Sequence, residues 1–267
     1  MRNSDTPLLV FVGLLALGGA AAWYYWNDLF PAPEEASTVT LPAPTEPVPD
    51  AGPTYPMPED SPASRLPRGE LVPLPPLDDS DAYFLLEIGA AFGPAIESLL
   101  VREAVIDRLV TTVDNLPRGK IAETIRPVGR LREAFVTETI DDTVELGISS
   151  YARYDALVGR LYYADLNAVY DTYRRFYPLF QKSYERLGYP DAYFNDRLVE
   201  VIDHLLATPM PDGPIVLVRP NVLYEFADTD LEALSSGQKL LLRMGPDNSA
   251  TLKRIMEKFR GRLTAGS

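Results

Sequence analysis

The stretch YADLNAVYDTYRRFYPLFQKSYERL (163–187) decides the fold of this chain. Its large apolar and aromatic residues recur at alternating steps of three and four: Tyr163, Leu166, Tyr170, Tyr173, Tyr177, Phe180, Tyr184 and Leu187. Because residues three and four apart share one face of an α-helix, this spacing predicts a long helix, or two helices in line, with an aromatic stripe. Pro178 lies inside the stripe and removes one backbone hydrogen bond, so we expect a bend or a new helix start near 176–178.

The aromatic stripe has two interpretations. Tyrosines at helical spacing usually bury their rings in a core and keep their hydroxyl groups at its edge, which is the interpretation we favour. The alternative is a stacking surface for sugar rings or for a peptide. In that case the candidate ligand-binding residues are Tyr170, Tyr173, Tyr177, Tyr189 and Tyr193.

The sequence on both sides of the stripe is also helical in pattern. Helices are expected over 82–92, 102–115, 236–244 and 249–263, with Pro94 in the first turn of another and with a turn at 189–191 that opens one more. Ser80 or Asp79 would cap the first, Gly245-Pro246 would end the helix over 236–244, and Asp247 or Asn248 would cap the last. Two pairs of short segments, 135–140 with 143–147 and 215–219 with 222–226, resemble β-hairpins or loop excursions. The predicted fold class is therefore mainly α, a helical domain over 77–267 with one or two short β-hairpins.

The segment after the stripe holds the best candidates for chemistry. Asp196, Glu200 and His204 recur every four residues, so they share one helix face, and Asp203 lies beside them. Neighbouring carboxylates and a histidine can perform acid–base catalysis, which makes these four the candidate catalytic residues. The interpretation we favour is structural: the acids pair with Arg174, Arg175 or Arg197, and His204 lies near the helix C-terminus, where the helix dipole favours it.

No metal site or cofactor is expected from the sequence. The chain has one histidine and no cysteine, and it lacks the His-Glu-x-x-His motif, a glycine-rich phosphate loop and a nucleophile elbow. A net charge of −13 also argues against a nucleic-acid partner, because an acidic protein repels phosphate.

The N-terminal part predicts attachment to a membrane. The stretch LLVFVGLLALGGAAAWYYW (8–26) contains no charge, and as a helix it would be about 28 Å long, close to the hydrocarbon thickness of a bilayer. Its aromatic end suits the headgroup region. A cleaved signal peptide ending near Ala20-Ala21-Ala22 is the alternative. Arg2 precedes the stretch and no Lys or Arg follows before Arg65, so we expect residues 1–7 in the cytoplasm and the remainder exported.

Residues 27–76 are rich in proline, acidic and small polar residues and poor in aliphatic ones. Such a composition cannot bury enough apolar surface to fold, so a disordered, extended linker is predicted. A passive spacer is the simplest role for it. The alternative is that Pro73-Leu74-Pro75-Pro76 docks into an aromatic groove.

Three runs in the domain resemble a known bacterial family. They are TVDNLPRGK (112–120), YRRFYPLFQKSYERLGYPDAYFNDRLVEVIDHLLATP (173–209) and GPIVLVRPNVLYEFADTDLEALSSGQKLLLRMGP (213–246). They are similar to the domain-of-unknown-function family numbered 3014. The resemblance implies an N-terminal membrane anchor and a proline-rich linker before a shared domain, and it implies no reaction and no catalytic residue.

Two functions fit these observations. The first is an inner-membrane-anchored envelope protein whose periplasmic helical domain binds a protein partner or cell-wall material. The second is a hydrolase-type enzyme that acts on a glycan or a peptide through the face of Asp196, Glu200 and His204.

Overall fold

The computed structural model describes residues 52–58, 73–92, 100–119, 125, 127, 135–220 and 224–265. The predicted membrane span at 8–26, residues 1–7 and Pro94 lie outside these ranges. Within the described ranges, no helix has both the length and the apolar character needed to cross a membrane.

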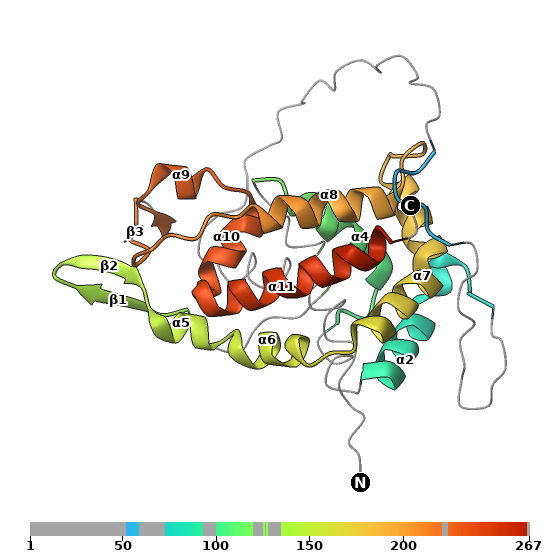
Figure 1. Cartoon of the computed structure of the whole chain (residues 1–267), viewed down its shortest axis with the longest axis horizontal. Coiled ribbons are helices and arrows are strands. Elements are labelled where there is room, and N and C mark those ends of the chain that lie inside the picture. The colour runs from blue at the N-terminus through green and yellow to red at the C-terminus, as the bar shows by residue number, and fades with distance from the viewer. Residues whose placement is uncertain are drawn as a thin grey trace, which may run out of the picture.

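The described residues form a mainly helical domain with two short antiparallel β-hairpins (Figure 1). In chain order the elements are η1 (Leu77–Asp79), α2 (Asp81–Phe92), α4 (Val105–Asn115), β1 (Thr137–Ile140), β2 (Thr143–Leu146), α5 (Ile148–Ala152), α6 (Asp155–Tyr162), α7 (Leu166–Arg186), α8 (Phe194–Leu206), β3 (Leu217–Val218), β4 (Glu225–Phe226), α9 (Thr229–Glu232), α10 (Ser236–Arg243) and α11 (Gly245–Leu263). The predicted fold class is confirmed for this part of the chain, and both predicted hairpins are present.

Helix α7 is continuous, with Pro178 inside it. It begins at the cap residue Asp165, whose carboxylate accepts hydrogen bonds from the amides of Asn167 and Ala168. The predicted new helix start near 176–178 is wrong. Phe176 and Phe180, one turn apart on either side of the proline, are both fully buried, so packing holds the helix together across the missing hydrogen bond.

Two other predicted helix ends are also corrected. Helix α4 begins at Val105 rather than at 102, and the Asp81 carboxylate of α2 accepts the amides of Ala104 and Val105 at 2.6 and 2.8 Å. Helix α11 begins at Gly245 rather than at 249. Pro246 therefore lies in the first turn, where its fixed φ angle suits a helix and its missing N–H is not needed.

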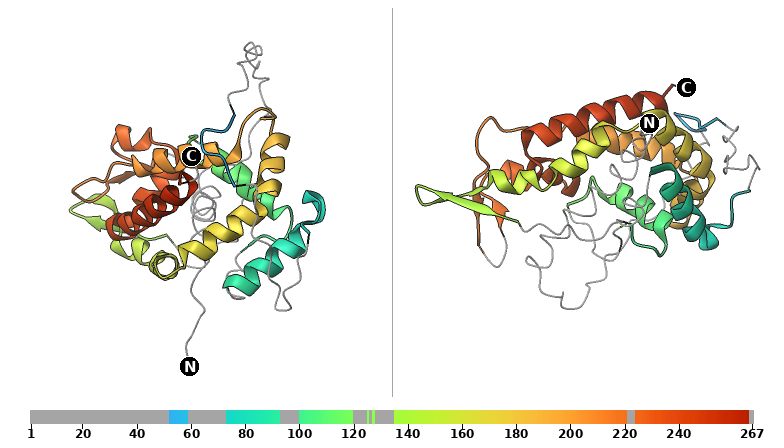
Figure 2. Two further views of the ribbon diagram at one scale, coloured as in Figure 1. Left: turned by 45° about the vertical axis from the view of Figure 1, so that its right-hand side comes forward. Right: turned by 90° about the horizontal axis from the view of Figure 1, so that it is seen from below.

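The aromatic stripe lies mostly in the core. Tyr173, Phe180 and Tyr184 are buried, whereas the end residues Tyr163 and Leu187 are exposed. Helix α7 packs against α4, α8 and α11, and Figure 2 shows it beside these helices from two further directions. The buried rings form one continuous main cluster.

A smaller lobe contains the two hairpins. Leu146 donates its amide to the carbonyl of Ile215, and Glu145 bridges Val216, so strand β2 lies beside β3. The lobe has its own buried cluster of Leu146, Ile215, Leu217, Phe226 and Leu242. The β1–β2 hairpin projects from one end of the molecule (Figure 1), and its turn residues Asp141 and Asp142 both have positive φ angles. Such a turn matches the twist of a two-residue hairpin.

Residues 52–58 also lie against the helical body, beside the C-terminal end of α11 (Figures 1 and 2). The side chains of Tyr55 and Met57 pack on the main cluster, as does that of Leu74. These described residues of the predicted linker thus contact the helical body.

Candidate functional site

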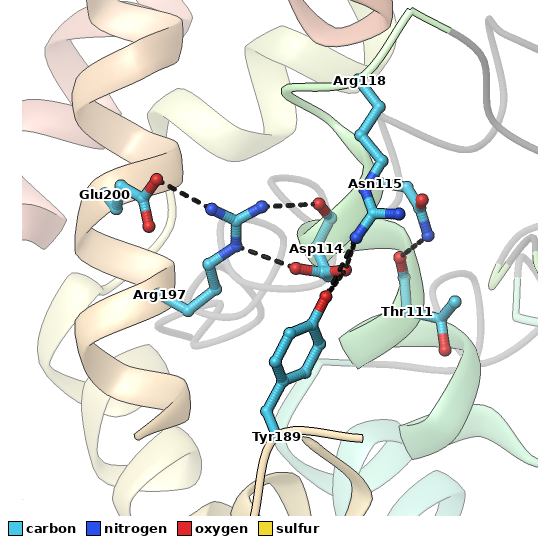
Figure 3. Close-up of polar contacts among 7 residues, drawn as sticks. All are labelled: Thr111, Asp114, Asn115, Arg118, Tyr189, Arg197 and Glu200. Carbon is cyan, nitrogen blue, oxygen red and sulfur yellow. Dashed lines mark hydrogen bonds and ion pairs between the residues drawn. The ribbon is translucent and has the colours of Figure 1, made fainter. Parts of the chain in front are cut away.

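The most enclosed carboxylate among the described residues is that of Asp114, near the end of α4. Its side chain is only 5 % exposed. Arg197 of α8 donates from Nε to Asp114 Oδ1 at 2.9 Å and from Nη2 to the Asp114 carbonyl at 2.9 Å (Figure 3). One guanidinium thus binds both the side chain and the main chain of one residue, which fixes α8 against the end of α4.

The second oxygen of Asp114 is also occupied. Arg118 Nη2 lies 2.6 Å from Oδ2, and the Tyr189 hydroxyl lies 3.4 Å from the same atom and 3.1 Å from Arg118 (Figure 3). The Tyr189 ring stacks on Tyr184 of α7. Asp114 therefore connects α4 and α8 with the turn that follows α7.

The Asp114 cluster is built to hold the fold. Both carboxylate oxygens accept hydrogen bonds from guanidinium groups, and charge-assisted bonds of this kind are stronger than bonds between neutral groups. Burial lowers the pKa of Arg197, but its hydrogen bond to Glu200 and the charge of Asp114 outweigh burial and raise it above the ordinary value.

The four candidate catalytic residues are on one helix, α8, as predicted, but each has a different partner. The Asp196 carboxylate accepts the amides of Thr54 and Tyr55, both at 2.8 Å. Glu200 pairs with Arg197 at 2.8 Å, and Asp203 pairs with Arg260 of α11. Among the described residues, no group of three or more acids and histidines is arranged to hold a metal ion.

His204 lies 2.8 Å from the hydroxyl of Ser235. A serine beside a histidine suggests a nucleophile, but Ser235 caps α10: its Oγ accepts the Gln238 amide, and Gln238 Oε1 accepts the Ser235 amide. Ser235 is only 7 % exposed. Burial and, to a smaller extent, the charge of Arg197 lower the pKa of His204. The contact between His204 and Ser235 fixes α8 to the start of α10.

The five candidate tyrosines are dispersed. Tyr173 is fully buried and donates to Asn195 Oδ1 at 3.1 Å, and burial raises its pKa well above the usual value. Tyr177 donates to Gln181 at 3.2 Å, and burial raises its pKa to about 12. Tyr170 and Tyr193 are half-buried, and Tyr189 belongs to the Asp114 cluster. The rings of Tyr173 and Tyr177 meet edge to face, with their centroids 5.8 Å apart.

The sequence analysis did not single out Asp114 or Asn195. A signal for Asp114 was present: Arg118 follows it by four residues, a spacing suited to an ion pair on a helix. No comparable signal marks Asn195, because its partners, Tyr55 and Leu263, are distant in sequence.

The fold and these contacts define a class of protein. It is a helical domain that buried ion pairs hold together and that carries a small hairpin lobe. The chain belongs to the family described as a protein of unknown function, DUF3014, whose model matches residues 105–260. No curated protein and no solved structure matches it. The matched range begins at α4 and ends in α11, so it includes Asp114, Arg197 and Asn195 but not residues 52–58.

Proposed function

We propose that this chain is a membrane-tethered binding protein whose helical domain holds a protein partner on the exported side of the inner membrane. The uncharged stretch 8–26 supports the anchor, and Arg2 before it supports export of the domain. In a cell with two membranes this places the domain in the periplasm.

The outer face of the β1–β2 hairpin carries the proposal. Side chains alternate along a strand, and Val144 and Leu146 of β2 pack on the cluster of the small lobe. The opposite face therefore presents Val136 and Ile140, which are 42 % and 51 % exposed. Exposed apolar side chains on a projecting hairpin are typical of a docking surface.

Charge on the same face indicates the kind of partner. Glu138 and Glu145 lie directly opposite each other, an arrangement that is unfavourable for two carboxylates without a cation. Within the described part of the chain neither has an ion-pair partner. Strand β1 pairs only with β2 among the described strands, so its other edge can accept an additional strand. The partner we infer is an extended segment that carries lysine or arginine.

The hydrolase interpretation has less support. Asp196, Glu200 and His204 bind, respectively, the main chain of 54–55, Arg197 and Ser235. These contacts explain the three residues without a reaction.

Photo-crosslinking in intact cells tests the docking surface. A crosslinking amino acid at the exposed position Ile140 is expected to give a discrete adduct with the partner. The same amino acid at Glu257, which is exposed on α11, is expected to give no adduct. Glu138→Lys with Glu145→Lys should abolish the adduct. An adduct that survives both charge reversals would contradict the proposed partner chemistry.

A reporter fusion tests the tether. Alkaline phosphatase is active only after export, so its fusion to the C-terminus of the full chain should be active. Activity should disappear when residues 8–26 are deleted. An inactive fusion of the full chain would place the domain in the cytoplasm.

A further inference from the structure

The N-terminal end of α8 binds residues 52–58 mainly through their main chain. The two oxygens of Asp196 accept the successive amides of Thr54 and Tyr55, both at 2.8 Å, and Asn195 Nδ2 donates to the Tyr55 carbonyl at 2.8 Å. Three hydrogen bonds to two adjacent side chains thus hold one short stretch of backbone, which bends at Thr54 and Tyr55.

The site is organised from within the domain. Asn195 is fully buried, and its Oδ1 accepts the hydroxyl of Tyr173 while its Nδ2 also reaches the carbonyl of Leu263 at 3.4 Å. Helices α7 and α11 therefore fix the orientation of the amide that faces Tyr55. A buried amide held by three partners offers a fixed donor for a peptide carbonyl.

The bound sequence, GPTYPMP (52–58), matches this site. Proline has no amide hydrogen, and Thr54 and Tyr55 are the only adjacent non-proline residues after Pro53. Asp196 binds the amides of these two residues. Tyr55 and Met57 turn toward the main cluster, whereas Thr54 and Pro56 are exposed, so alternate side chains anchor the segment. The three prolines restrict the free segment and lower the entropy lost on docking.

We propose that Asn195 and Asp196 form a docking site for a proline-flanked tyrosine segment, occupied by the chain's own residues 52–58, and that its release lengthens the membrane tether. The change in length rests on the anchor proposed above. With the segment docked, residues 27–51 join the anchor to the domain. After release, residues 27–72 do so, because Leu74 still packs on the main cluster.

The two tethers differ widely in reach. At about 3.1 Å per residue for an extended proline-rich chain, the maximum is about 80 Å with the segment docked and about 140 Å after release. Docking is reversible in this proposal because a few hydrogen bonds and two half-buried side chains hold the segment, and it is not part of a helix or a sheet.

Distance measurements between two spin labels test the docking. The chain has no cysteine, so Thr54→Cys and Glu257→Cys, both exposed, place labels on the segment and on α11 of the full chain in lipid nanodiscs. The parent pair should give one narrow distance distribution. Asp196→Asn should broaden it and shift it to longer distances, because an amide replaces one of the two accepting oxygens with a donor. The matched control, Asp191→Asn, changes an exposed acid before α8 and should leave it narrow.

A variant in the segment keeps the test valid if Asp196→Asn unfolds the domain. Tyr55→Pro removes one of the two bound amides and an anchoring ring while the helices stay unchanged. It should broaden the distribution with no loss of helix signal in circular dichroism. A narrow distribution of unchanged mean in Tyr55→Pro would overturn the docking site.

A peptide in solution tests reversibility. The peptide DAGPTYPMPED (50–60) should compete with the segment and broaden the parent distribution in a saturable way. No change at saturating peptide would overturn the exchange. Glu138→Lys with Glu145→Lys should leave all these distances unchanged, so failure of the docking site and failure of the proposed hairpin surface are distinguishable.

Discussion

At the scale of single residues, Asp114 and Glu200 are both partners of Arg197, but their surroundings differ. Asp114 is 5 % exposed and Glu200 is 66 % exposed. Water screens an exposed ion pair, whereas removal of one partner of a buried pair leaves an uncompensated charge. We therefore expect Asp114→Asn to lower the free energy of unfolding by about 3–5 kcal/mol.

Glu200→Gln is the matched control for this prediction, with an expected cost below about 1 kcal/mol. Urea denaturation of the two variants and the parent measures both. Equal losses of stability in the two variants would show that the cluster around Asp114 does not hold α8 against α4 as its geometry indicates.

His204 gives the fold a pH dependence of predictable sign. Burial, followed by the charge of Arg197, lowers its pKa in the folded state, although Glu200 opposes the shift. The unfolded chain then binds the proton more readily than the folded chain. Stability should therefore fall as pH decreases from the ordinary histidine value of about 6.5 through the lower folded pKa.

Because the chain has one histidine, this window is assigned to His204 alone. Thermal melts between pH 5 and pH 8 should show a lower melting temperature on the acid side. His204→Gln should flatten this part of the profile. A parent profile that is flat from pH 5 to pH 7 would contradict the assignment.

The candidate catalytic residues of α8 show which features of single residues a sequence can predict. The four-residue spacing of Asp196, Glu200 and His204 correctly indicates one helix. It contains no information on which other elements approach that helix. The partners Thr54, Ser235 and Arg260 are far away in the chain, and only tertiary packing brings them to α8.

At the scale of elements, the junction between α10 and α11 depends on Gly245. Its φ is +78°, and a Cβ atom there would lie 2.5 Å from the ring of Tyr151. An L-residue meets both backbone strain and an aromatic ring that lies within a packed cluster. Gly245→Ala should lower stability by roughly 2–4 kcal/mol.

Gly261 provides the opposite case on the same helix. It lies in the last turn of α11, and a Cβ there would meet no atom within 4 Å. Gly261→Ala should therefore raise the free energy of unfolding by roughly 0.5 kcal/mol, through the better helix propensity of alanine. Chemical denaturation of the two alanine variants should give shifts of opposite sign, and shifts of the same sign would contradict the role given to Gly245.

The ends of elements were harder to predict than their existence. Hydrophobic spacing located α4, α7 and α11, but Gly245-Pro246 was read as the end of α10 alone. Gly245 also provides the reversal at the start of α11, and Pro246 begins that helix. This dipeptide therefore both ends α10 and begins α11. The ring of Tyr151 lies against its glycine, a contact that the sequence does not show.

At the scale of the whole molecule, helix α10 joins two separate cores. Leu241 is buried in the main cluster, and its neighbour Leu242 is buried in the small lobe. The small lobe has five buried apolar residues and strands of two to four residues. Its opening exposes less apolar surface than opening of the helical body, so its amides should exchange at a lower free energy.

Hydrogen exchange on two leucine variants tests this division. Loss of a buried leucine side chain costs about 2–5 kcal/mol in the cluster that contains it. Leu242→Ala should accelerate exchange at the amides of Leu146 and Ala227, which bond to residues 215 and 216. The protection of α7 should remain nearly as in the parent. Leu241→Ala, one residue earlier, should instead accelerate exchange in α7 and α8. If each variant accelerates both regions equally, the hairpin lobe is not a separate unit and cannot open toward a partner while the helical body stays folded.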